Sequence, residues 1–242
     1  MLKKLVFALI PIRTNIISKN TIPIITIDGP SGSGKGTISR KLASILCWNI
    51  LDSGAIYRAV AFFAMENNLQ LSDELNIRRL IKKTTIKFEL NSSYQQKILI
   101  NRIDASEGIR TEECGTNASI IAKYEGIRKD MITLQRNFLK KPGLIADGRD
   151  MGTVVFPDSK IKVFLTADVN VRAKRRYKEL KEKGINVSLT AVLSDMEIRD
   201  KQDRERKHGP LTMAHDSIIV DSTNKSIDFV VSEILNYHEK IY

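Results

Sequence analysis

The stretch 29-GPSGSGKGT-37 combines four glycines, two serines and one lysine directly after the apolar run 22-IPIITID-28. Glycines have no Cβ, so the backbone N–H groups of such a turn can point inward and approach an anion closely. A helix that begins at Lys35 would add its unpaired N–H groups and its positive end at the same place. The lysine supplies a full positive charge that can follow the oxygens of a polyphosphate. The spacing predicts a polyphosphate-binding loop made of Gly29, Pro30, Ser31, Gly32, Ser33, Gly34, Lys35, Gly36 and Thr37.

Three arginines occur where a second anion could bind. Arg58 follows a short apolar segment, Arg149 ends the apolar run 143-GLIADGR-149, and Arg110 lies at the end of a β-rich region. Open α/β sheets bind ligands at the carboxyl ends of their strands, and guanidinium groups pair well with phosphate. An acceptor phosphate is already largely ionised near neutral pH, so its attack on a phosphoryl group needs no general base. The residues therefore indicate phosphoryl transfer between two polyanions.

Apolar runs alternate with helical patterns along most of the chain, as in a parallel sheet that helices cover on both faces. The expected strands are 22–28, 49–52, 143–149, 161–167 and 217–223, and the expected helices are 35–48, 54–68, 117–140, 169–183 and a closing amphipathic helix. We expect Ser53 to cap the helix 54–68.

Two regions break this alternation. The runs 84-TTIKFEL-90 and 97-KILINRI-103, with turn residues 91–94 between them, predict a small antiparallel insertion. The charged segment 195–211 has few large apolar residues, which predicts a mobile, solvated element. We expect an N-terminal extension at 1–20, a core at 21–71 and 116–242, an insertion at 72–115 and a lid at 184–211 within the core.

The composition is that of a globular chain with a strong positive charge. Its 242 residues are 42% hydrophobic and carry a formal net charge of +11, which favours anionic partners. Stacking on single-stranded nucleic acid needs exposed aromatic rings, and aromatics make up only 6% of the chain. A basic nucleic-acid-binding protein therefore remains an alternative that only the charge favours.

The first twenty residues carry four basic side chains and no acidic one. Their apolar run, 5–10, is too short to span a bilayer, and no small-residue cleavage site follows it. Cys47 and Cys114 match no metal-binding or redox spacing, and Cys47 is expected in the core. These features favour a cytoplasmic protein with no membrane span.

Several segments together resemble bacterial cytidylate kinase. They are 27-IDGPSGSGKGT-37, 52-DSGAIYRAV-60, 109-IRTEE-113, 143-GLIADGRDMGTVVFPD-158 and 197-EIRDKQDRER-206. The similarity extends from about Ile22 to the C-terminus. In the common phosphate loop a serine or threonine follows the lysine directly, whereas Gly36 intervenes here, as in nucleoside monophosphate kinases. Direct contact of Thr37 with magnesium therefore stays open.

The resemblance implies an α/β P-loop kinase with a five-stranded parallel sheet covered by helices, a small antiparallel β insertion over the acceptor nucleotide, and a mobile lid. It implies transfer of the γ-phosphoryl group of ATP to CMP or dCMP, with Mg²⁺ as cofactor. Nothing in the sequence demands a partner chain, so we expect a monomer. UMP, AMP and shikimate stay as alternative acceptors, which the insertion and the segment 149-RDMGT-153 argue against.

The same resemblance assigns roles to particular residues. The catalytic residues would be Lys35, Arg149, Arg175 and Arg176, and the CMP-binding residues would be Ser53, Tyr57, Arg58, Arg110, Ser119, Arg128, Arg149, Asp150, Arg199, Asp203 and Arg206. Asp150 would accept from the cytosine amino group, while Ser119 and Arg128 contact the other polar edge of the ring. Arg199 and Asp203 would contact the sugar. The phosphate contacts would be Arg58, Arg110, Arg149 and Arg206, and Asp147 would orient magnesium through a bound water.

Overall fold

The computed structural model describes residues 21–90, 96–182 and 184–242. The expected extension at 1–20 and the expected turn at 91–94 lie outside these residues. Five parallel strands form the central sheet in the order β2-β6-β1-β7-β8. They are β1 (Ile24–Asp28), β2 (Asn49–Asp52), β6 (Leu144–Gly148), β7 (Ile161–Thr166) and β8 (Ile218–Asp221). The predicted five-stranded parallel sheet is confirmed.

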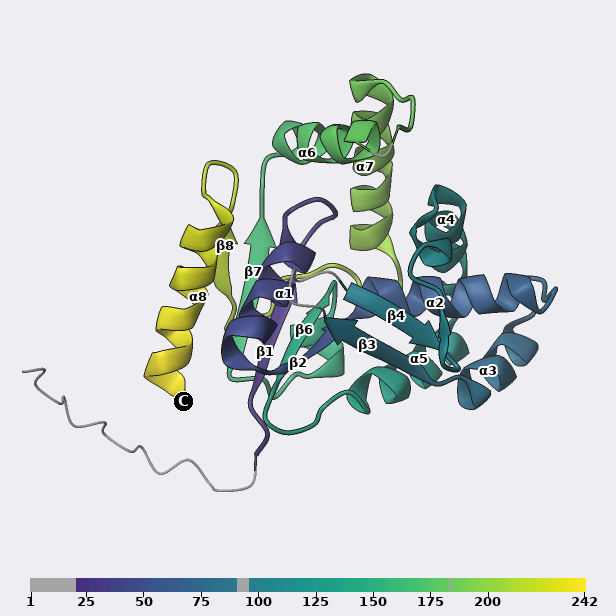
Figure 1. Cartoon of the computed structure of the whole chain (residues 1–242), viewed down its shortest axis with the longest axis horizontal. Coiled ribbons are helices and arrows are strands. Elements are labelled where there is room, and N and C mark those ends of the chain that lie inside the picture. The colour runs from purple at the N-terminus through teal and green to yellow at the C-terminus, as the bar shows by residue number, and fades with distance from the viewer. Residues whose placement is uncertain (1–20, 91–95, 183) are drawn as a thin grey trace, which may run out of the picture.

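Two hydrophobic clusters on opposite faces of the sheet account for its nearly continuous apolar strands (Figure 1). Ile145 of β6 packs with helices α1 (Lys35–Leu46) and α8 (Ile227–Ile241). Its neighbours Leu144 and Ala146 point the other way, toward α2 (Ser53–Glu66), α3 (Glu74–Lys83) and α5 (Glu125–Arg136). Successive strand residues alternate between faces, so a strand buried on both sides shows no polar alternation.

The α2 helix begins one residue earlier than expected. The carboxylate of Asp52 accepts a hydrogen bond from the backbone N–H of Ala55 at 2.9 Å, so Asp52 caps the helix. The expectation that Ser53 is the cap is therefore wrong, and Ser53 is the buried first residue of the helix. Cys47, expected in the core, is exposed just after α1 with a positive φ of 54°.

The predicted helix at 117–140 is two helices, α4 (Glu112–Ile121) and α5. The chain turns between them, where the N–H of Lys123 bonds to the carbonyl of Ile120 at 3.2 Å. This turn lets Ile121 and Ile127 both enter the same core.

The antiparallel insertion is confirmed, with a third strand that the sequence pattern did not predict. Its sheet contains β3 (Ile86–Leu90), β4 (Gln96–Ile100) and β5 (Ile103–Asp104), and a short 3₁₀ helix, η1 (Gly108–Arg110), follows. The run expected as one strand reverses at Asn101 and Arg102, which both adopt positive φ.

Residues 195–205 of the charged segment 195–211 belong to helix α7 (Leu189–Glu205), which packs against α6 (Val169–Glu182). Ser188 caps α7 by accepting from the N–H of Ala191 at 3.1 Å. Ala173, Leu180, Val192 and Met196 form a small core between the two helices. Few apolar residues are enough to hold α7 against α6, because α7 contacts α6 along one narrow face. The mobility of this segment stays a prediction. Within the described part of the chain, no helix is long and apolar enough to cross a membrane.

Candidate active site

The glycine loop lies between the end of β1 and the start of α1, as expected (Figure 1). A Cβ on Gly29 would lie 2.0 Å from the carbonyl oxygen of Leu165, so the chain passes too close to β7 for any other residue. Gly34 precedes the helix with a φ of 97°, a left-handed conformation that glycine adopts without strain. The loop therefore has the backbone path that its glycines predict.

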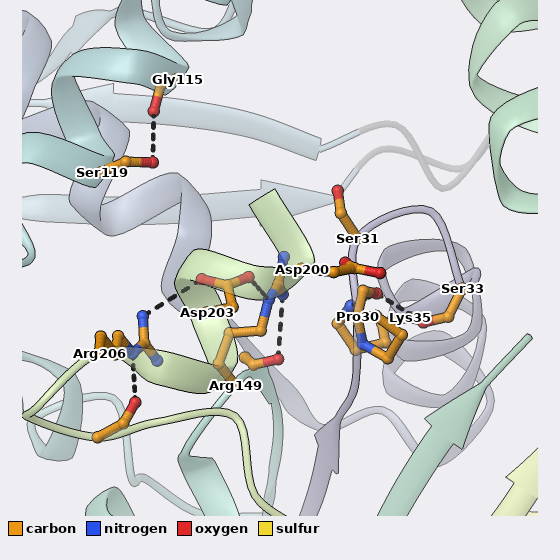
Figure 2. A network of polar contacts seen from close by, with 12 residues as sticks. Pro30, Ser31, Ser33, Lys35, Gly115, Ser119, Arg149, Asp200, Asp203 and Arg206 are labelled. Carbon is orange, nitrogen blue, oxygen red and sulfur yellow. Dashed lines mark hydrogen bonds and ion pairs between the residues drawn. The ribbon is translucent and has the colours of Figure 1, made fainter. Parts of the chain in front are cut away.

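Lys35 is buried in the loop, and its Nζ donates to the carbonyl oxygen of Pro30 at 2.7 Å (Figure 2). Ser33 Oγ donates to the same oxygen at 3.0 Å. Burial, followed by repulsion from Arg149, lowers the pKa of Lys35, whereas Asp147 acts in the opposite direction. A polyphosphate in the loop would offer this ammonium group a stronger partner than a carbonyl oxygen.

Carboxylates gather beside the lysine. Burial raises the pKa of Asp147, and Asp52 and Asp28 act in the same direction by repulsion while Lys35 opposes them. The Asp147 carboxylate also lies near the start of α1, since Oδ2 would be 3.5 Å from a Cβ on Gly36. Magnesium prefers oxygen ligands and commonly joins one or two carboxylates to substrate phosphates. The Asp147 carboxylate fits that donor set, and among the described residues no cluster of three or more His, Cys, Asp or Glu could hold a metal alone.

Asp28, the residue before the glycine loop, fixes the backbone that follows Arg149 and Asp150. Its Oδ1 and Oδ2 accept the backbone N–H groups of Met151 and Gly152, each at 2.8 Å. These residues begin η2 (Met151–Val155), a π-helical turn that directly follows Arg149 and Asp150. Asp28 thus ties the two anion sites together. Sequence reasoning missed this role, although an aspartate ending a buried apolar strand was a signal.

Asp28 should leave a signature in the pH dependence of stability. Burial raises its pKa from 3.8 to about 6, against the hydrogen bonds from Gly152 and Met151. Between these values the folded state binds more protons than the unfolded state, so the contribution of Asp28 to the free energy of unfolding falls as pH rises. The full change is about 3 kcal/mol at most. Urea titrations across this range should show a steeper fall for the wild type than for Asp28→Asn; equal slopes would contradict the assignment.

A cavity opens on the other side of Arg149, between α2, α4 and α7. Ten of the eleven predicted CMP-binding residues line it: Ser53, Tyr57, Arg58, Ser119, Arg128, Arg149, Asp150, Arg199, Asp203 and Arg206. Its remaining lining residues, which the sequence did not single out, are Gly54, Ala118, Ala122, Lys123, Gly148 and Gln202. Arg110 is exposed outside this lining, and its Nη2 donates to the carbonyl oxygen of Gln96 at 3.2 Å.

The cavity is rich in guanidinium groups. Arg149 Nε donates to Asp203 Oδ2 at 2.7 Å, and Arg206 Nη1 lies 3.5 Å from Asp203 Oδ1 (Figure 2). Arg58 Nη1 donates to the carbonyl oxygens of Ile109 and Thr111. Burial lowers the pKa of Arg199, and repulsion from Arg149 and Arg58 lowers it further. A bound phosphate dianion would relieve the mutual repulsion among these three half-buried guanidinium groups.

The cavity lining also contains a buried ion pair. Arg128 Nη2 donates to Asp150 Oδ2, and both side chains are almost fully buried. The guanidinium of Arg128 lies 5.8 Å from the centre of the Tyr57 ring. Ser119, another lining residue, donates its Oγ–H to the carbonyl oxygen of Gly115 at 3.1 Å. A carboxylate, a guanidinium and a hydroxyl around one cavity can distinguish donors from acceptors on a flat ring.

Arg175 and Arg176, the two arginines of α6 that were predicted to be catalytic, contact residues outside the glycine loop. Arg175 Nη2 donates to the carbonyl oxygen of Ser222 at 2.7 Å, and Arg176 pairs with Glu112 and Glu179. Ser222 Oγ in turn donates to the carbonyl oxygen of Ser33, so Arg175 reaches the glycine loop through one residue. The arginine of α6 that contacts the loop directly is Arg172, which sequence reasoning missed. Its place on the buried face of α6 could be read only from packing.

A glycine loop between a strand and a helix, in a parallel sheet of order β2-β6-β1-β7-β8, defines a P-loop fold. An arginine-lined cavity beside that loop, able to hold a second anion, is the arrangement of a kinase whose acceptor is also charged. The site and the fold together therefore define a P-loop kinase.

Comparison with known proteins gives the family. The family described as Cytidylate kinase matches residues 25–240. Cytidylate kinase from Methylococcus capsulatus is 48% identical over 90% of this chain and 97% of its own, and that from Aeromonas salmonicida is 46% identical over 90% and 94%. A solved shikimate kinase from Acinetobacter baumannii, 17% identical, covers 91% of this chain and 94% of its own with a TM-score of 0.42. The chain belongs to the cytidylate kinase family, and it is therefore a phosphotransferase.

The family match also bears on the N-terminal extension. It begins at residue 25, and each described lining residue of the cavity and loop lies beyond that point. We expect a chain that begins at Thr21 to keep the kcat and KM of the full chain. Steady-state kinetics on both forms tests this, and a loss of activity in the shorter form would show that residues 1–20 take part in catalysis.

Proposed function

We propose that this protein transfers the γ-phosphoryl group of ATP to CMP or dCMP, giving ADP and CDP or dCDP. The glycine loop would bind the triphosphate and the arginine-lined cavity would bind the monophosphate. The observation that carries the proposal is the position of Arg149. It lies between the two sites, where it acts on Lys35 electrostatically and pairs with Asp203 of the cavity.

The loop and the arginines would supply most of the catalysis. Two nucleotides with charged phosphates repel each other, and fixed N–H groups, one ammonium group and several guanidiniums offset this repulsion. Arg58, Arg149 and Arg206 are proposed to hold the acceptor phosphate, with Lys35 moving from Pro30 to the β and γ oxygens. Because Arg110 is exposed outside the cavity lining, it would contact the phosphate only after the insertion moves. Arg175 and Arg176 are proposed to approach the transferred group when the lid segment closes and excludes water.

Magnesium would be held between Asp147 and the phosphates. The crowded carboxylates near Lys35 support this proposal, because a divalent cation would reduce their repulsion. Bound there, it would neutralise charge on the β and γ phosphates. Thr37 is exposed and its Oγ1 accepts from Arg40 at 3.3 Å, so we propose no direct contact between Thr37 and the metal.

The acceptor preference would come from three residues of the cavity lining, Asp150, Arg128 and Ser119. Cytosine presents an amino donor at C4 and acceptors at N3 and O2, which suit a carboxylate, a guanidinium and a hydroxyl. Uracil would place its C4 oxygen against Asp150, acceptor against acceptor, and buried unpaired groups cost about 1–3 kcal/mol each. A coupled assay with CMP, dCMP, UMP and AMP as acceptors should therefore rank CMP and dCMP above UMP and AMP. A preference for UMP or AMP would show that the acceptor is not CMP or dCMP.

Asp150→Ala tests the base contact itself. We expect the ratio of kcat/KM for CMP over UMP to fall about tenfold or more, while the affinity for ATP stays near the wild-type value. The matched control is Asp216→Ala, which removes a carboxylate paired with Lys162 outside the cavity lining. An unchanged CMP/UMP ratio in a folded Asp150→Ala variant would remove this assignment.

A further inference from the structure

Arg172 of α6 is a buried guanidinium that joins three separate elements. Its Nε donates to the carbonyl oxygen of Ala167 at 2.9 Å, at the end of β7. Its Nη1 donates to the carbonyl oxygen of Ser31 in the glycine loop at 2.9 Å. Its Nη2 donates to Asp200 Oδ2 on α7 at 2.7 Å. Arg172 is 5% exposed and Asp200 is 2% exposed, so water screens this pair little.

Asp200 belongs to the helix that supplies one side of the acceptor cavity. Its neighbour Arg199 and the next-turn residue Asp203 both line that cavity. In Figure 2, Asp200 lies between Asp203 and the residues of the glycine loop. One guanidinium therefore connects the backbone of the triphosphate loop with the helix that touches the acceptor.

The tip of the loop also packs directly against helices α6 and α7. A Cβ on Gly32 would lie 2.7 Å from Met196 Cε of α7 and 3.2 Å from Arg172 Cβ of α6. A shift of α7 therefore moves side chains against the loop as well as pulling on the ion pair. Close-packed contacts of this kind transmit displacement instead of absorbing it.

One carboxylate oxygen of Asp200 lacks a hydrogen-bond partner within the described part of the chain. Among the residues that the structure describes, no donor reaches its buried Oδ1. Leaving a buried acceptor unfilled is unfavourable, and a pair kept only for stability would gain by filling it.

We propose that Arg172 and Asp200 are positioning residues that couple the two substrate sites, so that CMP bound against α7 tightens the binding of ATP in the glycine loop. The coupling is reciprocal, because two ligands of one protein change each other's affinity by the same factor. The inference rests on the proposed function, since it takes Arg199 and Asp203 as acceptor contacts. It adds an energetic coupling between the ATP site and the CMP site to that function.

The test is the affinity for a fluorescent, non-hydrolysable ATP analogue with Mg²⁺, measured with and without saturating CMP. We expect CMP to tighten binding by about fivefold or more in the wild type, the lower end of usual coupling factors. In Asp200→Asn this factor should fall close to one, while the affinity for each ligand alone changes much less. Arg172→Lys keeps the charge but loses the planar fork, so it should lose the coupling too.

The matched control is Glu233→Gln, which neutralises the carboxylate of an ion pair with Lys225 beside α8, away from both sites. It should keep the wild-type factor. A purely structural pair would lower the unfolding temperature and leave the factor unchanged, and that result in folded Asp200→Asn would overturn the proposal. A wild-type factor near one would overturn it as well.

Hydrogen exchange on the wild-type protein keeps the test independent of how the variants fold. CMP alone should slow amide exchange in residues 29–35 as well as in α7. Protection confined to the acceptor cavity would contradict the coupling. If CMP binds without changing the affinity for the analogue, only this inference fails; if CMP does not bind, the proposed function fails too.

Discussion

Lys35→Met is expected to lower kcat about 100- to 1,000-fold, with a folded protein and weaker binding of ATP. Methionine has nearly the length of lysine and suits a buried position, so the change mainly removes the charge. Loss of one preorganised electrostatic contact to a transition state commonly costs a factor of this size. Steady-state kinetics at saturating CMP measures it, and thermal unfolding checks the fold.

Lys41→Met is the control for this prediction. Lys41 lies on the same helix, but it pairs with exposed Asp228 at the surface. We expect its kcat to stay at the wild-type value. A Lys35→Met variant with normal kcat would show that the loop amides alone stabilise the transferred phosphoryl group.

Arg149→Met is expected to reduce kcat/KM for CMP by about 100-fold or more. The change removes the guanidinium that lies between the sites and leaves the half-buried carboxylate of Asp203 without its 2.7 Å partner. Both the acceptor affinity and the transfer rate should suffer, so KM should rise and kcat should fall. Measurements of both constants at several CMP concentrations separate the two effects.

Arg78→Met provides the comparison. Arg78 Nε also donates to a carboxylate at 2.7 Å, that of Asp130, but this pair joins α3 and α5 outside the cavity lining. Its loss should lower stability without a comparable change in kcat/KM. Equal kinetic losses in both variants would mean that Arg149 acts through stability alone.

Local chemistry explains which features the sequence could predict. The loop 29–37 is recognisable because only glycines allow its path, and β1 and β6 are recognisable because strands buried on both faces are continuously apolar. The residues around the acceptor cavity were predicted through family resemblance, and the structure brings ten of them to one place. Their individual roles remain proposals.

Long-range packing explains what the sequence did not reveal. Asp28 contacts residues more than a hundred positions away, so no local pattern could indicate its partners. Arg172, Arg175 and Arg176 lie on one basic helix, and only the packing of α6 on α7 decides which of them reaches the loop. The reversal at Asn101 and Arg102 required positive φ at two residues other than glycine, which an apolar run does not predict.

The most direct measurement follows the phosphoryl group itself. Wild-type protein is mixed with Mg²⁺, CMP and ATP that carries a radioactive γ-phosphate, and the nucleotides are separated. Label should appear in CDP as fast as ATP is consumed, and omission of CMP should nearly stop that consumption. Protein that binds the triphosphate but labels no pyrimidine diphosphate would contradict the whole account.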